Sequence, residues 1–385
     1  MIPLVKDTIS HAEMDALADW LRTYPRLTKG NLCIEFEENW SHFLGCKYSV
    51  FVNSGSSANL LMLYSLIETG ILKQGDQVVV PSVSWATDLA PVVQLGLEPI
   101  LCDCNLYDLS IDLEDFENIL RKNNPKALIF VSILGLVPNM DEVQQLCDRK
   151  NVLLLEDACE SFGSKYKGKN LGTFGLMSSF STFFGHHLST IEGGLVCTDD
   201  RDLYNLLKCI RSHGWDRDND DYYQKDLRSK HSITDDFESL YTFYKMGFNF
   251  RSTDLQAFLG IHQLEKAQFV IETRNKNYQL YHSLIKSPFW SAPLSSEERY
   301  ISNFAYPMIS DKRTEITNKL IEAGVQTRPL ICGSIGRQPF WVKNFGLCPK
   351  KNADKVHDHG FYLPNNCEIT EEEIKFICSL VEDTQ

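Results

Sequence analysis

The fold class is predicted by the stretch KALIFVSILGLVPNMDEVQQLCDRKNVLLLEDACE, residues 126–160. Residues 126–135 and 151–157 are short apolar runs that end in turn or polar residues, which is typical of buried strands in a parallel sheet. Between them, residues 140–150 space their apolar side chains as one face of a helix does. A strand, a helix and a second strand in this order predict an α/β fold.

The same alternation extends on both sides of this stretch, from about residue 50 to 200. Residues 77–83 predict another buried strand, and residues 112–123 predict another helix. From about Glu265 onward the pattern mixes helices with short strands and turns. We therefore expect a large domain over residues 1–264 with a mainly parallel sheet, and a smaller α+β domain over residues 265–385.

Length and composition exclude several classes of protein. The 385 residues exceed what one core usually organises, which favours two lobes. The shares of 43% hydrophobic and 23% charged residues are those of an ordinary globular protein. We expect no membrane association, because no stretch approaches the roughly 20 uncharged apolar residues of a spanning helix. The net charge of -13 argues against nucleic acid as a partner.

The cysteines and the first residues predict a cytoplasmic protein. The chain has 12 cysteines, and its first 20 residues lack the apolar core of a secretory signal. Reduced thiols, many of them buried, are the expectation in such a chain. Cys102 and Cys104 have no second pair at zinc-finger spacing, so we expect no structural zinc.

Two segments predict where a ligand lies. The turn Asn53–Asn59 precedes a helical pattern, for which Ser56 or Ser57 suits the N-cap and Gly70 suits the stop. The free N–H groups of such a helix start suit a phosphate, although a well-capped helix alone would have the same sequence. The strand 151–157 ends in acidic residues, at the sheet edge where ligands of α/β proteins bind.

Several motifs in chain order resemble those of one family, the pyridoxal-phosphate (PLP)-dependent nucleotide-sugar aminotransferases of fold type I. The resemblance spans nearly the whole chain and implies a three-layer large domain followed by a small one. The matching segments are NSGSSANLL (53–61), VPSVSWATD (80–88), LLEDACESFG (154–163), SSFSTFFGHHLSTIEGG (178–194), RSHGWDRD (211–218) and GFNFRSTDLQAFLG (247–260).

One position departs from the family pattern. The aminotransferases carry a lysine six residues before the Glu of Glu-Gly-Gly, where it forms a Schiff base with PLP. Counting back from Glu192 reaches His186. An imidazole has no primary amine to form that bond, but it can move protons near neutral pH. His186 and His187 could instead be core histidines or a metal pair, but they lack the i, i+4 spacing of a two-histidine zinc motif.

Histidine at this position is typical of the 3-dehydratase branch of the family. The resemblance therefore implies a lyase that makes dideoxysugars, for example those of a lipopolysaccharide O-antigen. It implies PLP or pyridoxamine phosphate (PMP) held noncovalently, and L-glutamate as the amino donor. The implied substrate is a nucleotide-linked 4-keto-6-deoxyhexose, with GDP-4-keto-6-deoxymannose as our expectation. The implied products are a 4-keto-3,6-dideoxy sugar, ammonia and 2-oxoglutarate.

The resemblance also implies a role for each matching residue in a homodimer with shared active sites. His186 is implied to be the catalytic acid and base, and Asp157 to pair with the pyridinium nitrogen. The residues implied to hold the cofactor are Gly55, Ser56, Ser57, Trp85, Asp157, Glu160, Ser181 and, from the partner subunit, Asn249. The residues implied to contact the substrate are His213, Arg217, Arg251 and Arg328. Arginine suits this role because its guanidinium binds phosphate oxygens through two hydrogen bonds. Each arginine could equally form a surface ion pair instead.

Alternative functions remain open at this stage. A CDP-linked 3-dehydratase would carry an iron–sulfur cluster, which the absence of cysteine between Cys209 and Cys332 disfavours, although Gly336–Pro339 is similar to that branch. A nucleotide-sugar aminotransferase would need another lysine, such as Lys165, Lys167 or Lys169, which the pattern places in a solvated hairpin. A cofactor- or sugar-binding protein without activity is the third alternative.

Overall fold

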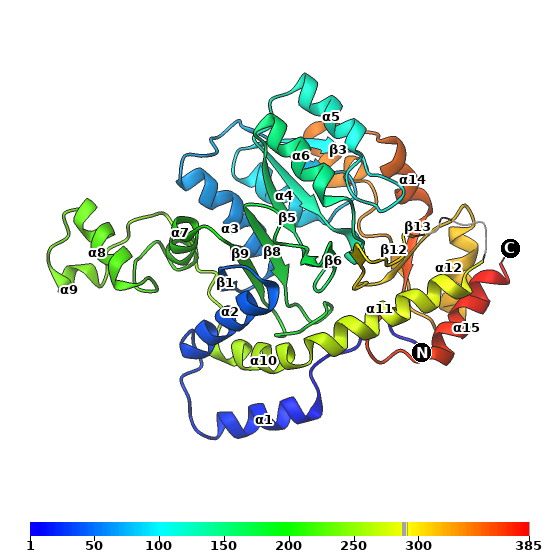
Figure 1. Cartoon of the computed structure of the whole chain (residues 1–385), viewed down its shortest axis with the longest axis horizontal. Helices are drawn as coiled ribbons and strands as arrows, with labels where there is room; N and C mark the ends of the chain where they lie inside the picture. The colour runs from blue at the N-terminus through cyan, green and yellow to red at the C-terminus, as the bar shows by residue number, and fades with distance from the viewer. Residues whose placement is uncertain (287–289, 291, 385) are drawn as a thin grey trace.

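The computed structural model describes residues 1–286, 290 and 292–384, and its centre is a seven-stranded sheet (Figure 1). In spatial order the strands are β1 (Tyr48–Val52), β9 (Gly194–Thr198), β8 (Met177–Ser181), β5 (Leu153–Asp157), β4 (Ala127–Val131), β2 (Gln77–Pro81) and β3 (Glu98–Cys102). Strand β9 runs antiparallel to both of its neighbours, and the pairs from β8 to β3 are all parallel. The predicted α/β class and mainly parallel sheet are confirmed.

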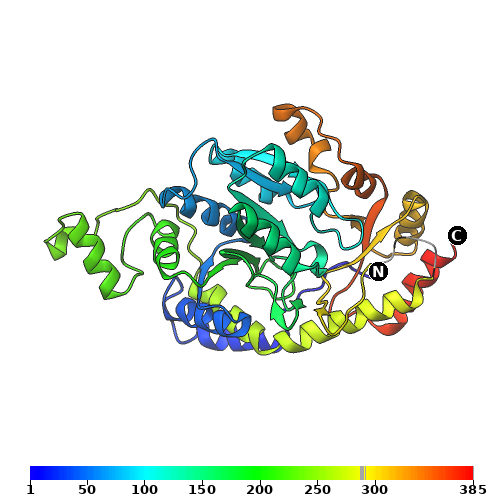
Figure 2. The same ribbon diagram turned by 45° about the horizontal axis from the view of Figure 1, so that its top comes forward.

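Helices cover both faces of this sheet (Figure 2). Side chains along β1 point alternately to the two faces of the sheet. Val50 and Val52 belong to the hydrophobic core on one face, and Phe51 belongs to the core on the other face, together with Phe36 and Trp40. The helices of this part are α1 (His11–Leu21), α2 (Asn31–Leu44), α3 (Gly55–Glu68), α4 (Ala86–Gln94), α5 (Leu113–Lys122), α6 (Met140–Lys150), α7 (Arg201–Arg211), α8 (Asp221–Lys230), α9 (Asp236–Ser239) and α10 (Asp254–Glu265).

The C-terminal part combines helices with a small antiparallel sheet of β11 (Tyr306–Ile309), β13 (Gly360–Leu363) and β12 (Arg328–Pro329). The helices here are α11 (Ala267–Leu284), α12 (Arg313–Glu322), α13 (Pro339–Phe345), α14 (Lys351–His359) and α15 (Glu371–Glu382). A third sheet joins β10 (Arg299–Tyr300), β6 (Lys165–Tyr166) and β7 (Lys169–Asn170). The proposed domain boundary at residue 264 lies at the end of α10 and stays a prediction.

Most local predictions agree with the structure, but the three predicted strands are each shorter than expected, most of all the one over residues 126–135. The helices predicted over residues 112–123 and 140–150 correspond to α5 and α6. The strand predicted over residues 126–135 ends at Val131 and is followed by the 3₁₀ turn η1 (Ile133–Gly135). Leu134 and Gly135 have φ values of 52° and 78°, so the chain turns away from the sheet there.

Across the described residues, none of the helices has the length and apolar character needed to cross a membrane.

Candidate active site

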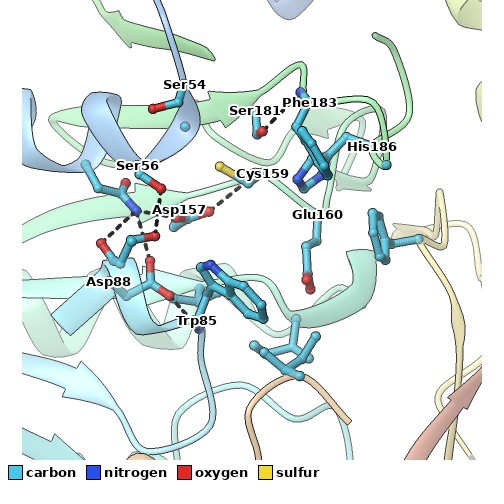
Figure 3. Close-up of a pocket in the computed structure, with 18 of the residues that line it drawn as sticks. Ser54, Ser56, Trp85, Asp88, Asp157, Cys159, Glu160, Ser181, Phe183 and His186 are labelled. Carbon is cyan, nitrogen blue, oxygen red and sulfur yellow. Dashed lines mark hydrogen bonds between the residues drawn. The ribbon is translucent and has the colours of Figure 1, made fainter. Parts of the chain in front are cut away.

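A cavity of about 460 Å³ opens at the carboxyl ends of the parallel strands (Figure 3). Val131 of β4, Asp157 of β5 and Ser181 of β8 contribute to its wall, together with the first residues of α3 and the N-cap residue of α4. The carboxyl edge of a parallel sheet is where α/β proteins bind their ligands. The position predicted from residues 151–157 is therefore the position of the cavity.

Helix α3, whose start faces the cavity, has a different N-cap residue from the two that the sequence predicted. Helix α3 begins at Gly55, and its N-cap is Ser54, whose Oγ accepts from the Ser57 N–H at 3.0 Å. The prediction of Ser56 or Ser57 as N-cap was wrong, because Ser54 is still extended at φ -169° while the following residues are already helical. The stop at Gly70 agrees with its left-handed φ of 76°.

The start of α3 is bare backbone, which suits a phosphate. A Cβ on Gly55 would lie 2.8 Å from Ser181 Cβ and 3.0 Å from Cys159 Sγ, so only glycine fits there. The first N–H groups of a helix have no partner within it, and they carry the positive end of its dipole. Ser56 and Ser181 place hydroxyls on the same cavity. These residues fit the phosphate of the predicted cofactor.

A pair of buried carboxylates lies deeper in the cavity. Asp157 accepts from the Cys159 N–H at 2.9 Å and from Asn59 Nδ2 at 2.7 Å, and Asn59 Nδ2 also donates to Asp88 Oδ1 at 3.0 Å. Burial and the neighbouring Asp157 raise the pKa of Asp88 well above its ordinary value. The protonated form of Asp88 is thus favoured. The Asp157 carboxyl, held by these two donors, is placed to pair with a protonated ring nitrogen.

Glu160 is a third acidic group on the cavity wall. Its Oε2 accepts from the Leu134 N–H at 2.8 Å, in the 3₁₀ turn after β4. Burial raises the pKa of Glu160 to about 8, and the nearby charge of Asp157 acts in the same direction. Near neutral pH the protonated form of this carboxyl is therefore favoured, and that form can donate a hydrogen bond to a ligand.

The two adjacent histidines have different surroundings. His186 lines the cavity beside Phe304, with ring centroids 5.3 Å apart. His187 does not line the cavity; it is buried, and its Nε2 lies 3.1 Å from the carbonyl oxygen of Ser302. His187 is therefore a structural residue, and His186 is the one that can meet a ligand. Burial lowers the pKa of His186 to about 4, although Asp157 nearby opposes that shift.

No lysine is among the described residues that line the cavity. The three lysines considered as alternatives lie in the hairpin of β6 and β7, which confirms the predicted hairpin. Lys167 is half exposed and its Nζ is 2.6 Å from Asp141 Oδ2, while Lys169 stands over the ring of Phe174. Among the described residues of the cavity wall, none carries the primary amine that a Schiff base with the cofactor would need.

The cavity wall includes seven of the predicted cofactor and catalytic residues, namely Gly55, Ser56, Trp85, Asp157, Glu160, Ser181 and His186. Ser57 does not line it, and its N–H donates to Ser54 Oγ. His213, Arg217 and Arg251 gather instead around Trp215, with Arg217 Cζ 4.3 Å and Arg251 Cζ 5.4 Å from a Trp215 ring centroid. Their substrate roles stay predictions.

Two further predicted residues also lie off the cavity wall of their own chain. Asn249 pairs through its backbone with Ser212, close to the Trp215 group. Arg328 is exposed on β12 next to Tyr362, which does line the cavity. A position outside its own chain's cavity is compatible with Asn249 serving a partner subunit, as predicted.

Several wall residues were missed by the sequence reading. The missed residues are Leu4, Val5, Ser54, Asn59, Thr87, Asp88, Val131, Ile133, Cys159, Phe183, Gly185, Glu192, Phe304, Ile331 and Tyr362. Asn59 and Asp88 lie within the quoted motifs, in the first turns of the helices that follow Ser54 and Trp85. Their positions relative to those N-cap residues could have indicated them. Leu4 and Phe304 come from distant parts of the chain, and nothing local in the sequence marks them.

The sheet, the bare helix start and the buried aspartate define a fold-type I transferase with a site for a phosphorylated pyridine cofactor. The chain belongs to the DegT/DnrJ/EryC1/StrS aminotransferase family, whose model matches residues 7–382. The family resemblance predicted from the motifs is therefore confirmed, and so is the fold class.

Named relatives and solved structures are similar to the chain over almost its whole length. The GDP-4-keto-6-deoxy-D-mannose 3-dehydratase of Yersinia pseudotuberculosis is 34% identical over 99% of this chain and 98% of its own. The protein of that name from Escherichia coli O55:H7 is 33% identical over 94% of this chain and 93% of its own. A crystal structure of GDP-4-keto-6-deoxymannose-3-dehydratase with a trapped PLP–glutamate geminal diamine has a TM-score of 0.89 and 31% identity, covering 99% and 100%.

Proposed function

We propose that this chain is a PLP- and PMP-dependent 3-dehydratase of a nucleotide-linked 4-keto-6-deoxyhexose. The observation that carries the proposal is an imidazole, that of His186, on a cavity wall where no described residue is a lysine. Relatives with printed dehydratase names at 33% and 34% identity support the same reaction. GDP-4-keto-6-deoxymannose is the proposed substrate and L-glutamate the proposed amino donor.

The geometry of the cavity supports a role for each proposed binding residue. The start of α3, with Gly55 and Ser56, holds the phosphate together with the Ser181 hydroxyl. Asp157 pairs with the ring nitrogen, and Asn59 fixes the orientation of that carboxylate. Trp85, which is 58% exposed at the cavity mouth, offers an aromatic face to the ring. All of these contacts are noncovalent, so the cofactor can leave and return.

When bound, the cofactor would supply an amine that condenses with the sugar ketone, and a ring that takes up the electron pair left on carbon when the neighbouring proton is removed. His186 is neutral at the working pH, because burial disfavours its cation. Its free lone pair takes the proton released at the reacting centre. Once protonated it is a strong acid, and it passes the proton to the departing carbon-3 hydroxyl.

The reaction balances without an added oxidant or reductant. One 4-keto-6-deoxy sugar and one glutamate give one 4-keto-3,6-dideoxy sugar, one 2-oxoglutarate and one ammonia. An aminotransferase would instead leave nitrogen on carbon 4 of the sugar. That reaction uses a lysine, which both donates a proton to carbon 4 and bonds covalently to the cofactor. The imidazole of His186 can move the proton but cannot carry the cofactor.

A homodimer with shared sites is part of the proposal. Asn249 lies outside the cavity of its own chain, and the mouth of that cavity exposes large apolar side chains. Phe183 is 43% exposed, and its neighbour Phe184 is 40% exposed. A two-fold symmetric partner would cover these rings and bring its own Asn249 to the phosphate. We also propose a cytoplasmic location, since all 12 cysteines are free thiols.

The test is an incubation of the purified protein with PLP, L-glutamate and a 4-keto-6-deoxy nucleotide sugar, with GDP- and CDP-linked substrates in parallel. We expect the GDP-linked product to be lighter by one oxygen atom, with one ammonia and one 2-oxoglutarate per turnover. A product that gains nitrogen would replace the proposal with an aminotransferase. Turnover of the CDP-linked sugar alone would correct the carrier, and the absence of any product would leave a binding protein.

A further inference from the structure

The N-terminal segment crosses the active-site cavity as a strap, which we define as residues 2–8. At one end, Ile2 forms a parallel bridge with Val325, and its N–H donates to the Gly324 carbonyl at 2.8 Å. At the other end, the Thr8 hydroxyl donates to Gln263 Oε1 at 2.7 Å. The strap is thus fixed to the C-terminal part and to α10 at the same time.

The strap is also joined to the loop that carries His186. Gln263 is fully buried, and its Oε1 accepts from the Ser189 N–H at 3.1 Å as well as from Thr8. Ser189 follows His186 by three residues. Both the strap and the catalytic loop therefore take their position from one amide side chain.

Between these anchors, Leu4 and Val5 line the cavity. A Cβ placed on Gly185, the residue before His186, would lie 3.9 Å from Val5 Cγ2 and 3.4 Å from the Phe183 ring. Leu4, Val5 and Phe183 carry no hydrogen-bonding side-chain atom, and neither does the Phe304 ring beside His186. An apolar wall therefore borders the reacting imidazole.

We infer that Leu4 and Val5 are specificity-determining residues that read the methyl group at carbon 6 of the sugar. The inference rests on the proposed function, which sets the reacting carbons of the sugar beside His186. Carbon 6 is two bonds from carbon 4, so it lies within reach of the wall that borders this histidine. A methyl group packs on these side chains, whereas a hydroxymethyl group would lose its water without gaining a partner.

The experiment compares two unreactive ligands that differ only in the carbon-6 hydroxyl, GDP-mannose and GDP-6-deoxymannose. Dissociation constants are measured by calorimetry on the cofactor-loaded protein. We expect the wild-type chain to prefer the deoxy sugar by about 10- to 100-fold, the range for an added hydroxyl in an apolar pocket. Val5→Thr, which keeps the shape of the side chain but adds a hydroxyl, should reduce this preference by about threefold or more.

Two more variants complete the test. Leu4→Asn should reduce the preference in the same direction, whereas Val342→Thr, the same chemical change on the partly exposed helix α13, should leave it unchanged. Equal affinity of the wild-type chain for the two sugars overturns the inference, and so does an unchanged preference in both strap variants. Absence of binding for both sugars would overturn the proposed function as well, whereas binding without preference overturns the inference alone.

Discussion

His186 carries the difference between this chain and the aminotransferases of its family. Its imidazole borders the cavity beside Phe304, and the described wall of that cavity has no lysine. The histidine can move a proton but cannot form an imine. In the proposed function, the identity of this one side chain separates removal of oxygen from addition of nitrogen, while the fold around it stays that of the family.

The exchange His186→Lys should convert a noncovalent cofactor site into a covalent one. A lysine at this position would present a primary amine to the PLP aldehyde, so borohydride treatment should leave a cofactor adduct that mass spectrometry locates at residue 186. Dehydration should fall by at least about 100-fold, the usual share of a positioned acid–base group. His186→Asn is the control, since it should lose dehydration without forming an adduct. Dehydration retained by the lysine variant would remove His186 from the mechanism.

Because His186 is buried, we expect its imidazole to have a low pKa, which can be measured on the protein without any substrate. Burial lowers the pKa of His186 to about 4 from an ordinary 6.5, so the folded chain favours the neutral ring. In the ligand-free protein, the His186 ring resonances should titrate with a midpoint near 4, assigned by their loss in His186→Asn. By linkage, stability should decline as the pH falls from 6.5 towards 4, because the unfolded chain then binds more protons. A midpoint near 6.5 would contradict the proposed environment.

The sequence allowed the residues within motifs to be predicted, but not those that the fold brings in from elsewhere. Asp157, Glu160 and Ser181 lie at strand ends within recognisable segments, and all three line the cavity. Leu4 and Phe304 line the same cavity, yet 300 residues separate them in the chain. Their place depends on tertiary packing, such as the bridge between Ile2 and Val325, for which a single sequence carries no periodic signal.

Helix α3 illustrates how a correct element can have an incorrect start. Ser54, Ser56 and Ser57 are equally good N-cap residues by type, so composition alone cannot choose between them. In the structure the N-cap is Ser54, and the first helical residue, Gly55, lies too close to Ser181 and Cys159 for any side chain. The close packing of α3 on β8 thus fixes both the first helical residue and the position of the free N–H groups.

Removal of the α3 cap should affect both stability and cofactor binding. Ser54→Ala deletes the acceptor of the Ser57 N–H and should lower the free energy of unfolding by about 1 kcal/mol. It should also weaken PMP binding by about threefold, since the helix start would fray where the phosphate is held. Thr370→Ala, which uncaps α15 away from the cavity, is the matched control. It should cost similar stability and leave PMP affinity unchanged, and equal PMP affinity in the two variants would contradict the role of α3.

Two groups of predicted site residues lie in different parts of the molecule. One group lines the cavity, and the other gathers around Trp215 outside it, next to the segment that carries Asn249. In a shared site, each cavity would take its His186 from one subunit and its Asn249 from the other. Two inactive variants could then complement each other in a mixed dimer.

Subunit mixing provides the corresponding prediction. His186→Asn and Asn249→Ala should each have little activity, but dimers formed by unfolding and refolding them together should recover up to about a quarter of wild-type activity. In such a mixed dimer one cavity contains an intact His186 and an intact partner Asn249, which is the arrangement that a two-fold interface allows. Mixing His186→Asn with Asp157→Asn is the control and should restore nothing, because both groups belong to the cavity of one chain. No recovery in the first mixture would mean that the partner subunit does not supply Asn249 to the cavity, and would contradict the shared site.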